Sequence, residues 1–202
     1  MIIWVNGTFG SGKTTAAYEL QRRVEEAFVY DPERFGYMLM ANVPKEVAKD
    51  DFQDYSLWRE ANYRLLKQLD QEYNGVLIVP MTLTNEQYFD EIIGRLRENG
   101  VIVQHFTLKA SKSTIKKRLL KRWEGENSWA YQQAEGRLQS LENSLFKEHI
   151  QTDSLSIEEV VKTIARLSGV ELKPDHRSPW RKKLDRLAVS LKEIGIIKQG
   201  KH

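Results

Sequence analysis

Residues 7–14, with the sequence GTFGSGKT, have the spacing of a phosphate-binding loop. They match the pattern Gly-x-x-x-x-Gly-Lys-[Ser/Thr] and lie between an apolar run and an amphipathic segment, which is the context in which this pattern binds phosphate. Glycines let successive backbone N–H groups turn toward an anion, and the N-terminus of a following helix adds further N–H groups. We therefore expect ATP to bind here. The expected contacts are Gly7, Thr8, Phe9, Gly10, Ser11, Gly12, Lys13, Thr14 and Thr15.

Two side chains of this loop have separate expected roles. Lys13 would reach the β- and γ-phosphates and so act in catalysis, and the hydroxyl of Thr14 would bind Mg²⁺. A chance match in a glycine-rich turn is the alternative, but the flanking pattern argues against it. The sequence therefore predicts ATP and Mg²⁺ as cofactors.

Asp31 follows the apolar run from Ala27 to Tyr30 and is a candidate catalytic carboxylate. In a parallel sheet the carboxyl ends of the strands meet at one edge, so Asp31 is expected near the phosphate loop. A carboxylate there could accept a proton from an attacking hydroxyl and also help to bind the substrate. The alternative is an aspartate that forms a turn before Pro32.

The segment AKDDFQDYSLWR, residues 48–59, combines acids, aromatic residues and one arginine. This mixture suits a pocket for the acceptor, in which Phe52 and Trp58 supply apolar walls and Arg59 pairs with an anionic or sugar group. A helix start with a hydrophobic anchor explains the same residues equally well.

Three arginines are candidates for a lid over the nucleotide. Arg118 and Arg122 are four residues apart before the polar stretch EGENS, and Arg137 follows in the next helical segment. On a lid at about residues 122–137, Arg122 and Arg137 would neutralise charge on the transferring phosphoryl group, and Arg118 and Arg122 would contact the nucleotide. A solvated basic helix face is the alternative.

The elements that must position these residues alternate between apolar runs and segments of helical periodicity. This alternation predicts parallel βαβ units and an α/β fold. The apolar runs cover residues 1–5, 27–30, 75–83 and 101–108, and a last one begins near residue 150. The helical segments cover residues 13–26, 57–73, 111–123 and 130–146, with two more after the capping pairs Thr84–Gln87 and Ser156–Glu159.

Composition is that of an ordinary globular domain, with 202 residues, 41% hydrophobic and 29% charged. The chain has no cysteine, no charged leader and no apolar run of the roughly 20 residues that a membrane span needs, so we expect a cytoplasmic protein. Its four histidines lack metal-ligand spacing. We expect one nucleotide-binding domain over residues 1–172, then a linker and a helix over residues 173–202.

Charge distinguishes this tail from the domain. Residues 177–202 contain eight Lys or Arg and two acids, which gives this segment a net charge of +6. Because the net charge of the whole chain is +3, residues 1–176 carry a net charge of −3. The mildly acidic domain argues against nucleic-acid binding. From Trp180 to Ile194 the apolar residues recur at helical spacing, and most of the basic residues lie outside their arc. This predicts a basic amphipathic helix that contacts an anionic membrane peripherally. Docking on the domain or on a second copy is the alternative.

Several longer stretches resemble the tunicamycin-resistance ATP-binding proteins of bacilli. They are MIIWVNGTFGSGKT, YDPERFG, AKDDFQDYSLWR, GVLIVPMTL, FDEIIGRLRENG, EGENSW and HIQTDSLSI, so the resemblance spans nearly the whole chain. It implies a three-layer P-loop fold like that of small-molecule kinases, with a five-stranded parallel sheet in the order 2-3-1-4-5 and a helical lid. It also implies that Asp31 is the base or substrate anchor, that Arg118 and Arg122 are lid arginines, and that Thr152 and Asp153 lie near the adenine.

The resemblance implies a nucleoside antibiotic, tunicamycin, as the small-molecule partner. One departure is that the third apolar run ends in Pro80-Met81-Thr82, without the acid that many P-loop proteins place there for Mg²⁺. Three functions therefore remain open: a phosphotransferase that modifies the drug, an ATP-dependent protein that only binds it, and a nucleoside or sugar kinase of unrelated metabolic role.

Overall fold

A five-stranded parallel sheet forms the centre of the molecule. A computed structural model describes residues 1–120 and 128–199. The strands lie in the order β2-β3-β1-β4-β5, which confirms the predicted α/β fold and strand order. Their bounds are Ile2–Gly7 for β1, Ala27–Val29 for β2, Val76–Pro80 for β3, Val103–Lys109 for β4 and His149–Gln151 for β5.

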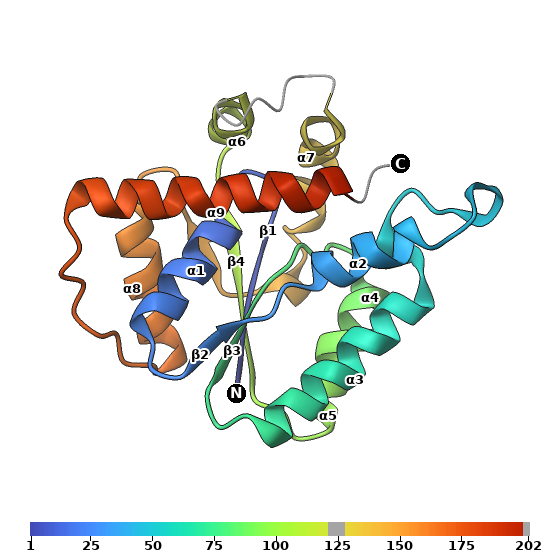
Figure 1. The fold of residues 1–202 in the computed structure, drawn as a ribbon, viewed down its shortest axis with the longest axis horizontal. Helices are drawn as coiled ribbons and strands as arrows, with labels where there is room; N and C mark the ends of the chain where they lie inside the picture. The colour runs from blue at the N-terminus through green and yellow to red at the C-terminus, as the bar shows by residue number, and fades with distance from the viewer. Residues whose placement is uncertain (121–127, 200–202) are drawn as a thin grey trace.

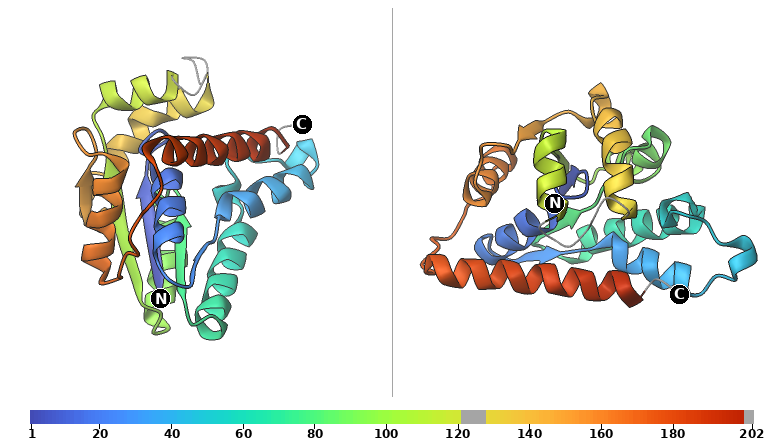
Figure 2. Two further views of the ribbon diagram at one scale, coloured as in Figure 1. Left: turned by 60° about the vertical axis from the view of Figure 1, so that its left-hand side comes forward. Right: turned by 90° about the horizontal axis from the view of Figure 1, so that it is seen from above.

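Helices cover both faces of the sheet, as Figures 1 and 2 show. One face packs against α1, Lys13–Arg23, and α8, Ile157–Ser168. The other face packs against α3, Ser56–Glu72, and a continuous helical stretch made of α4, Glu86–Phe89, a π-helical turn, Asp90–Gly94, and α5, Arg95–Glu98. The result is a three-layer architecture with a core on each side of the sheet.

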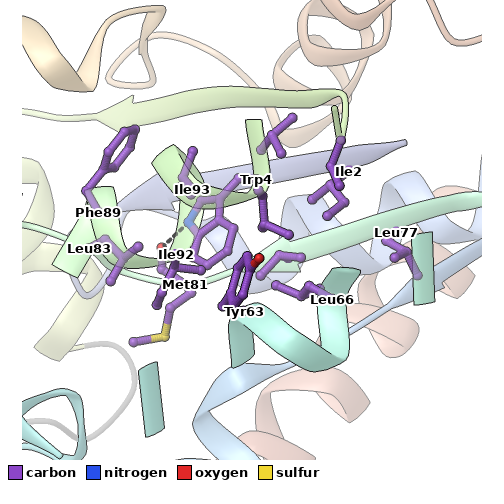
Figure 3. Close-up of a cluster of buried hydrophobic side chains, with 14 of the residues drawn as sticks. Ile2, Trp4, Tyr63, Leu66, Leu77, Met81, Leu83, Phe89, Ile92 and Ile93 are labelled. Atoms are coloured by element: carbon purple, nitrogen blue, oxygen red, sulfur yellow. Dashed lines mark hydrogen bonds between the residues drawn. The ribbon is translucent and has the colours of Figure 1, made fainter. Parts of the chain in front are cut away.

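Alternation along β1 divides the two cores, because successive side chains of a strand point to opposite faces. Ile2 and Trp4 belong to the core beneath α3, whereas Ile3 and Val5 belong to the core beneath α1 and α8. Figure 3 shows the first of these cores, in which the indole of Trp4 donates a hydrogen bond of 3.1 Å to the carbonyl of Met81. Both cores hold β1 rigidly, and β1 leads directly into the phosphate loop.

Two local predictions need correction. Helix α2, Pro32–Ala41, was not expected, yet the side chain of Asp31 caps it and proline is favoured at a first helical position. The helix after β3 is capped by Asn85, whose side chain accepts from the backbone N–H of Tyr88, and not by Thr84. The capping box of Ser156 and Glu159 at the start of α8 is confirmed.

Two helices lie beyond the carboxyl edge of the sheet, above the phosphate loop (Figure 1). They are α6, Lys112–Leu120, and α7, Trp129–Ser140. A small core of their own includes Ile115 and Leu119 of α6, with Phe9 of the phosphate loop packed against it. Three short 3₁₀ segments, Lys45–Val47, Phe52–Asp54 and Ser144–Phe146, complete the described elements.

The tail helix α9, Pro179–Gln199, lies across α1 and extends toward α2, as Figures 1 and 2 both show. Ion pairs hold the start of the tail on the domain. Arg177 and Arg186 both reach Glu19 of α1, whose side chain is only 4% exposed, at 2.5 and 3.4 Å. Lys182 lies 3.8 Å from Glu158 of α8 and also pairs with Asp175 of the linker at 2.9 Å. Ion pairs with Glu19 and Glu158 thus tie the tail to the domain.

Three apolar residues in the first part of the tail helix are exposed. Trp180 is 72% exposed, and Leu187 and Leu184 are also exposed. Two of the basic residues predicted to face a membrane, Lys182 and Arg186, face acids of the protein, while Arg181 and Lys183 are exposed. Among the described residues, no helix combines the length and apolarity that crossing a bilayer requires.

Candidate functional site

Three glycines shape the phosphate loop between β1 and α1. Gly7, Gly10 and Gly12 have φ values of 143°, 75° and 103°, which side chains with a Cβ rarely adopt. A Cβ at Gly7 would also lie 2.6 Å from both the carbonyl oxygen of Leu108 and the hydroxyl of Ser11. The loop therefore has its curved shape because these positions are glycine.

The start of α1 has backbone N–H groups that can bind an anion. Gly12 is its N-cap and lacks a side chain to accept a bond from the first N–H groups, and residues 13–16 include no acid. The hydroxyl of Ser11 is buried and has no hydrogen-bond partner among the described residues. A phosphate group would satisfy both the helix N–H groups and this hydroxyl, so the loop fits the predicted polyphosphate ligand.

Lys13 lies folded over this loop. Its side chain is almost fully buried, its ammonium donates to the carbonyl of Thr8 at 3.1 Å, and it lies 5.7 Å from the centre of the Phe9 ring. The following residue, Thr14, is half-buried in the first turn of α1. These positions suit a lysine that moves from a backbone carbonyl to a phosphate, and a hydroxyl that binds Mg²⁺ beside it.

Asp31 lies at the same edge of the sheet. β2 ends at Val29 beside Ile78 of β3, so Asp31 follows at the carboxyl end next to the phosphate loop. Its side chain is 5% exposed, accepts from the backbone N–H of Glu33 at 3.0 Å and lies 3.5 Å from Arg34. Burial raises the pKa of this carboxyl, against the lowering effects of the Glu33 N–H, Arg34 and Lys13. Asp31 thus caps α2, as the alternative interpretation held, and also interacts electrostatically with Lys13.

A buried polar network beneath the loop was not predicted. The side chain of Asn6 accepts from the N–H groups of Gly7 and Leu83, at 2.7 and 3.0 Å, and contacts His105 at 3.1 Å. Burial lowers the pKa of His105 to about 3, so this imidazole is neutral. Thr82 donates to the carbonyl of Gly7 at 2.7 Å. These residues fix the first turn of the loop. The only sequence signal for them was a polar residue, Asn6, at the end of the otherwise apolar strand β1.

The predicted acceptor segment forms a compact unit around Arg59. The Arg59 guanidinium bonds Glu91 at 2.5 Å and the carbonyl of Gln53 at 2.6 Å, and it lies 4.2 Å from the centre of the Tyr88 ring. Arg59 therefore already holds this segment to the helices behind it. Its partner Glu91 lies 32 residues away in sequence, so no local pattern indicated the pair.

The two aromatic residues of this segment are packed against each other. The rings of Phe52 and Trp58 are 5.2 Å apart, and Trp58 is fully buried and donates to the carbonyl of Pro32 at 3.1 Å. Trp58 therefore anchors the start of α2, the helix that Asp31 caps. Phe52 is buried as well, with its ring edge-on to that of Tyr37.

Arg118 of α6 connects the phosphate loop to the segment after β5. It donates to the carbonyl of Thr152 at 2.7 Å, to the Thr152 hydroxyl at 3.0 Å and to the carbonyl of Ser11 at 3.3 Å. Asp153 accepts from the backbone N–H and hydroxyl of Ser111, and these bonds lower its pKa. The structure thus brings Arg118, Thr152 and Asp153 together at one end of the loop.

Arg137 of α7 reaches the opposite end. It pairs with Asp51 at 2.8 Å, and its guanidinium lies 5.0 Å from the centre of the Phe9 ring. The third lid arginine, Arg122, lies outside the described residues, as do residues 123–127 of the expected lid. Within the described ranges, no group of three His, Asp or Glu side chains forms a metal site.

Comparison with known proteins agrees with this geometry. Residues 3–138 match the family model described as an AAA domain. The structure of the tunicamycin resistance protein of Deinococcus radiodurans is similar to this one, with 30% sequence identity, a TM-score of 0.72, and coverage of 86% of this chain and 99% of that chain. Among curated protein sequences the comparison finds no match.

Two more distant structures share the fold. A sugar kinase from Janibacter has 20% identity and a TM-score of 0.62, and covers 84% of this chain and 94% of its own. The APS kinase of Mycobacterium tuberculosis, in complex with AMPPNP and APS, has 17% identity and a TM-score of 0.54, and covers 83% of this chain and 96% of its own. The fold is thus that of nucleotide-binding, kinase-like P-loop proteins. The chain belongs to the AAA-domain family and to the family of the tunicamycin resistance protein of Deinococcus radiodurans.

Proposed function

We propose that the protein is an ATP-dependent phosphotransferase that acts on a hydroxyl group of a nucleoside acceptor such as tunicamycin. The observation that carries this proposal is the buried carboxyl of Asp31, which follows β2 at the carboxyl edge of the sheet, lies 3.5 Å from Arg34 and is near enough to Lys13 for that charge to lower its pKa. A carboxyl with a raised pKa is a better proton acceptor, as a general base must be. The similarity to the tunicamycin resistance protein supports the choice of acceptor.

The proposed reaction is a direct transfer. The acceptor hydroxyl oxygen attacks the γ-phosphorus of ATP, the bond from that phosphorus to the β,γ-bridging oxygen breaks, and ADP leaves. The hydroxyl proton passes to Asp31. Lys13 and the amides of the phosphate loop bind the phosphate oxygens and hold them in place. Mg²⁺ bound at Thr14 would neutralise part of the phosphate charge.

The acceptor side favours an uncharged molecule. Arg59 is bound by Glu91 and by the carbonyl of Gln53, so its charge is already paired, and Asp51 of the same segment faces Arg137 of α7. An anionic acceptor would gain little from an arginine that is already paired, whereas sugar hydroxyls could donate hydrogen bonds to the carboxylate of Asp51. A neutral sugar or nucleoside therefore fits this segment better than a phosphorylated or carboxylic substrate.

Mass spectrometry of tunicamycin after incubation with protein, MgCl₂ and ATP tests the proposal. We expect the drug to gain one phosphate group. Asp31→Asn is the matched variant, because asparagine still caps α2 but accepts a proton poorly, so it should bind ATP and transfer no phosphate. Phosphorylation of ordinary nucleosides or sugars, with unmodified drug, would instead indicate a metabolic kinase.

A second function, ATP-dependent sequestration of the drug, is favoured by the end of β3. In place of an acid, Met81 and Thr82 follow the last residue of this strand, and the Thr82 hydroxyl donates to the carbonyl of Gly7. Mg²⁺ would then have weaker protein support than in many P-loop enzymes. Drug that stays unmodified but co-purifies with the protein in the presence of ATP would support this function.

We also propose that the tail brings the protein to an anionic membrane surface. The exposed Trp180, Leu184 and Leu187, with the exposed Arg181 and Lys183, support this because apolar and basic side chains together bind such surfaces. Sedimentation with anionic and with neutral vesicles tests it. We expect binding to anionic vesicles that falls with salt and with Leu187→Asp, and equal recovery with both vesicle types would contradict the proposal.

A further inference from the structure

Phe9 of the phosphate loop packs against the two helices above the loop, α6 and α7, which we call the lid helices. Its ring packs against the small core formed by Ala110, Ile115 and Leu119, together with Tyr131 and Leu138 of α7. Two cations lie near this ring: Lys13 at 5.7 Å and Arg137 at 5.0 Å from its centre. Arg137 and Lys13 thus both lie near the centre of one ring of the phosphate loop.

Asp51 holds Arg137 at this place. Their ion pair is 2.8 Å long, and the two side chains are only 11% exposed for Arg137 and 19% for Asp51. A partly buried pair of this kind is less screened by water than one on the open surface. The contact joins α7, which lies over the phosphate loop, to the acceptor segment on the other side of the site.

Asp51 is itself rigidly placed. Its other oxygen caps the 3₁₀ segment Phe52–Asp54 by accepting from the backbone N–H of Gln53 at 3.0 Å. The carbonyl of Gln53 is bound by Arg59, and the hydroxyl of Tyr88 donates to Asp54 at 2.7 Å. The carboxylate of Asp51 is thus fixed by contacts that reach back to α3 and α4.

We propose that Asp51 is a positioning residue that fixes Arg137 of the lid helix beside the γ-phosphate of bound ATP. The inference rests on the proposed function, in which the phosphate loop binds ATP, and adds a residue from the acceptor segment that controls the lid arginine. Asp51 does not touch the reacting atoms. It fixes the direction of the guanidinium, so that the cation is in place when the terminal phosphate arrives.

This arrangement has a specific consequence for nucleotide binding. ATP and ADP share the α- and β-phosphates, so a cation placed at the γ-phosphate strengthens ATP binding and leaves ADP binding almost unchanged. The ratio of the two dissociation constants therefore reports the position of Arg137 without any catalysis and without the drug. A residue that only stabilises the fold would change the two affinities together.

The experiment is isothermal titration calorimetry of MgATP and MgADP with the full chain. We expect Arg137→Ala to reduce the preference for ATP over ADP about tenfold, as for the loss of one charge-assisted hydrogen bond. Asp51→Asn should reduce it at least threefold, although Arg137 is still present. The double variant should be no worse than Arg137→Ala alone, because the two residues act as one unit.

Glu46→Gln is the matched control, since it removes an exposed acid only five residues from Asp51. It should leave the ratio unchanged, which excludes a general effect of net charge. An unchanged ratio in Asp51→Asn, or losses in the two single variants that add in the double variant, would overturn the inference. Absence of ATP binding to the wild-type protein would instead show that the proposed function is wrong.

Discussion

Replacement of Arg177 by alanine should lower the free energy of unfolding, because it removes several ion pairs of the tail. Arg177 bonds three carboxylates, Glu19 at 2.5 Å, Asp185 at 2.8 Å and Asp175 at 2.9 Å. Glu19 is the decisive partner, because its side chain is 4% exposed and would remain buried with a weaker counter-charge. Removing one partner of a fully buried pair costs about 3–5 kcal/mol.

The expected cost is smaller than this upper range for two reasons. Arg177 is 21% exposed, and Glu19 keeps its contact with Arg186 at 3.4 Å. We therefore expect a loss of about 2 kcal/mol, within the range of a charge-assisted hydrogen bond. For a chain of this length each kcal/mol lowers the melting temperature by roughly 2–4 °C, so the variant should melt about 4–8 °C lower.

Urea unfolding and thermal unfolding both measure this change. Lys183→Ala is the control, since it removes an exposed positive charge from the same helix and should change stability by less than about 0.5 kcal/mol. Adding Glu19→Gln to Arg177→Ala should recover part of the loss, because the buried charge is then gone. Equal free energies of unfolding for Arg177→Ala and Lys183→Ala would refute the reasoning. A further loss of stability when Glu19→Gln is added to Arg177→Ala would also refute it.

Three other outcomes follow from the structure. Arg177 lowers the pKa of Asp175, so the ionised Asp175 carboxylate stabilises the fold fully above its unfolded pKa of about 3.9 and less as the pH falls below that value. In urea unfolding below about pH 4, the stability of the wild-type protein should therefore fall more steeply with pH than that of Arg177→Ala. Gly7→Ala should lower the free energy of unfolding by about 1–3 kcal/mol, measured by thermal unfolding, because alanine would have to adopt the positive φ of Gly7. Ser11→Ala should leave the nucleotide-free protein equally stable or up to about 1 kcal/mol more stable, since it removes an unpaired buried hydroxyl, while calorimetry should show severalfold weaker MgATP binding.

The sequence could predict those parts of the site that depend on neighbouring residues. The phosphate loop is contiguous, and its glycines, lysine and threonine act through backbone geometry that the spacing encodes. Asp31 could be placed at the loop because parallel strands end at one edge. The strand order came from the resemblance to a family, since strand and helix patterns alone do not determine which strands are neighbours.

The rest depends on pairs that are distant in sequence. Arg59 looked available to an acceptor, but Glu91 binds it from another helix. The helical spacing of the apolar residues in the tail could be recognised, whereas the ion pair that ties the tail to α1 joins Arg177 to Glu19, 158 residues earlier in the chain. Helix α2 was missed because its apolar residues lack clear periodicity and Gly36 interrupts them, although Asp31-Pro32 is a helix-start signal.

Calorimetric titration of MgATP into wild-type protein and into Lys13→Ala tests the central claim most directly. If the phosphate loop grips the triphosphate, the wild-type protein binds MgATP and the variant binds it about 10- to 100-fold more weakly, as expected for one charge-assisted hydrogen bond. Equal affinity of the two proteins, or no heat of binding with the wild type, would contradict the account.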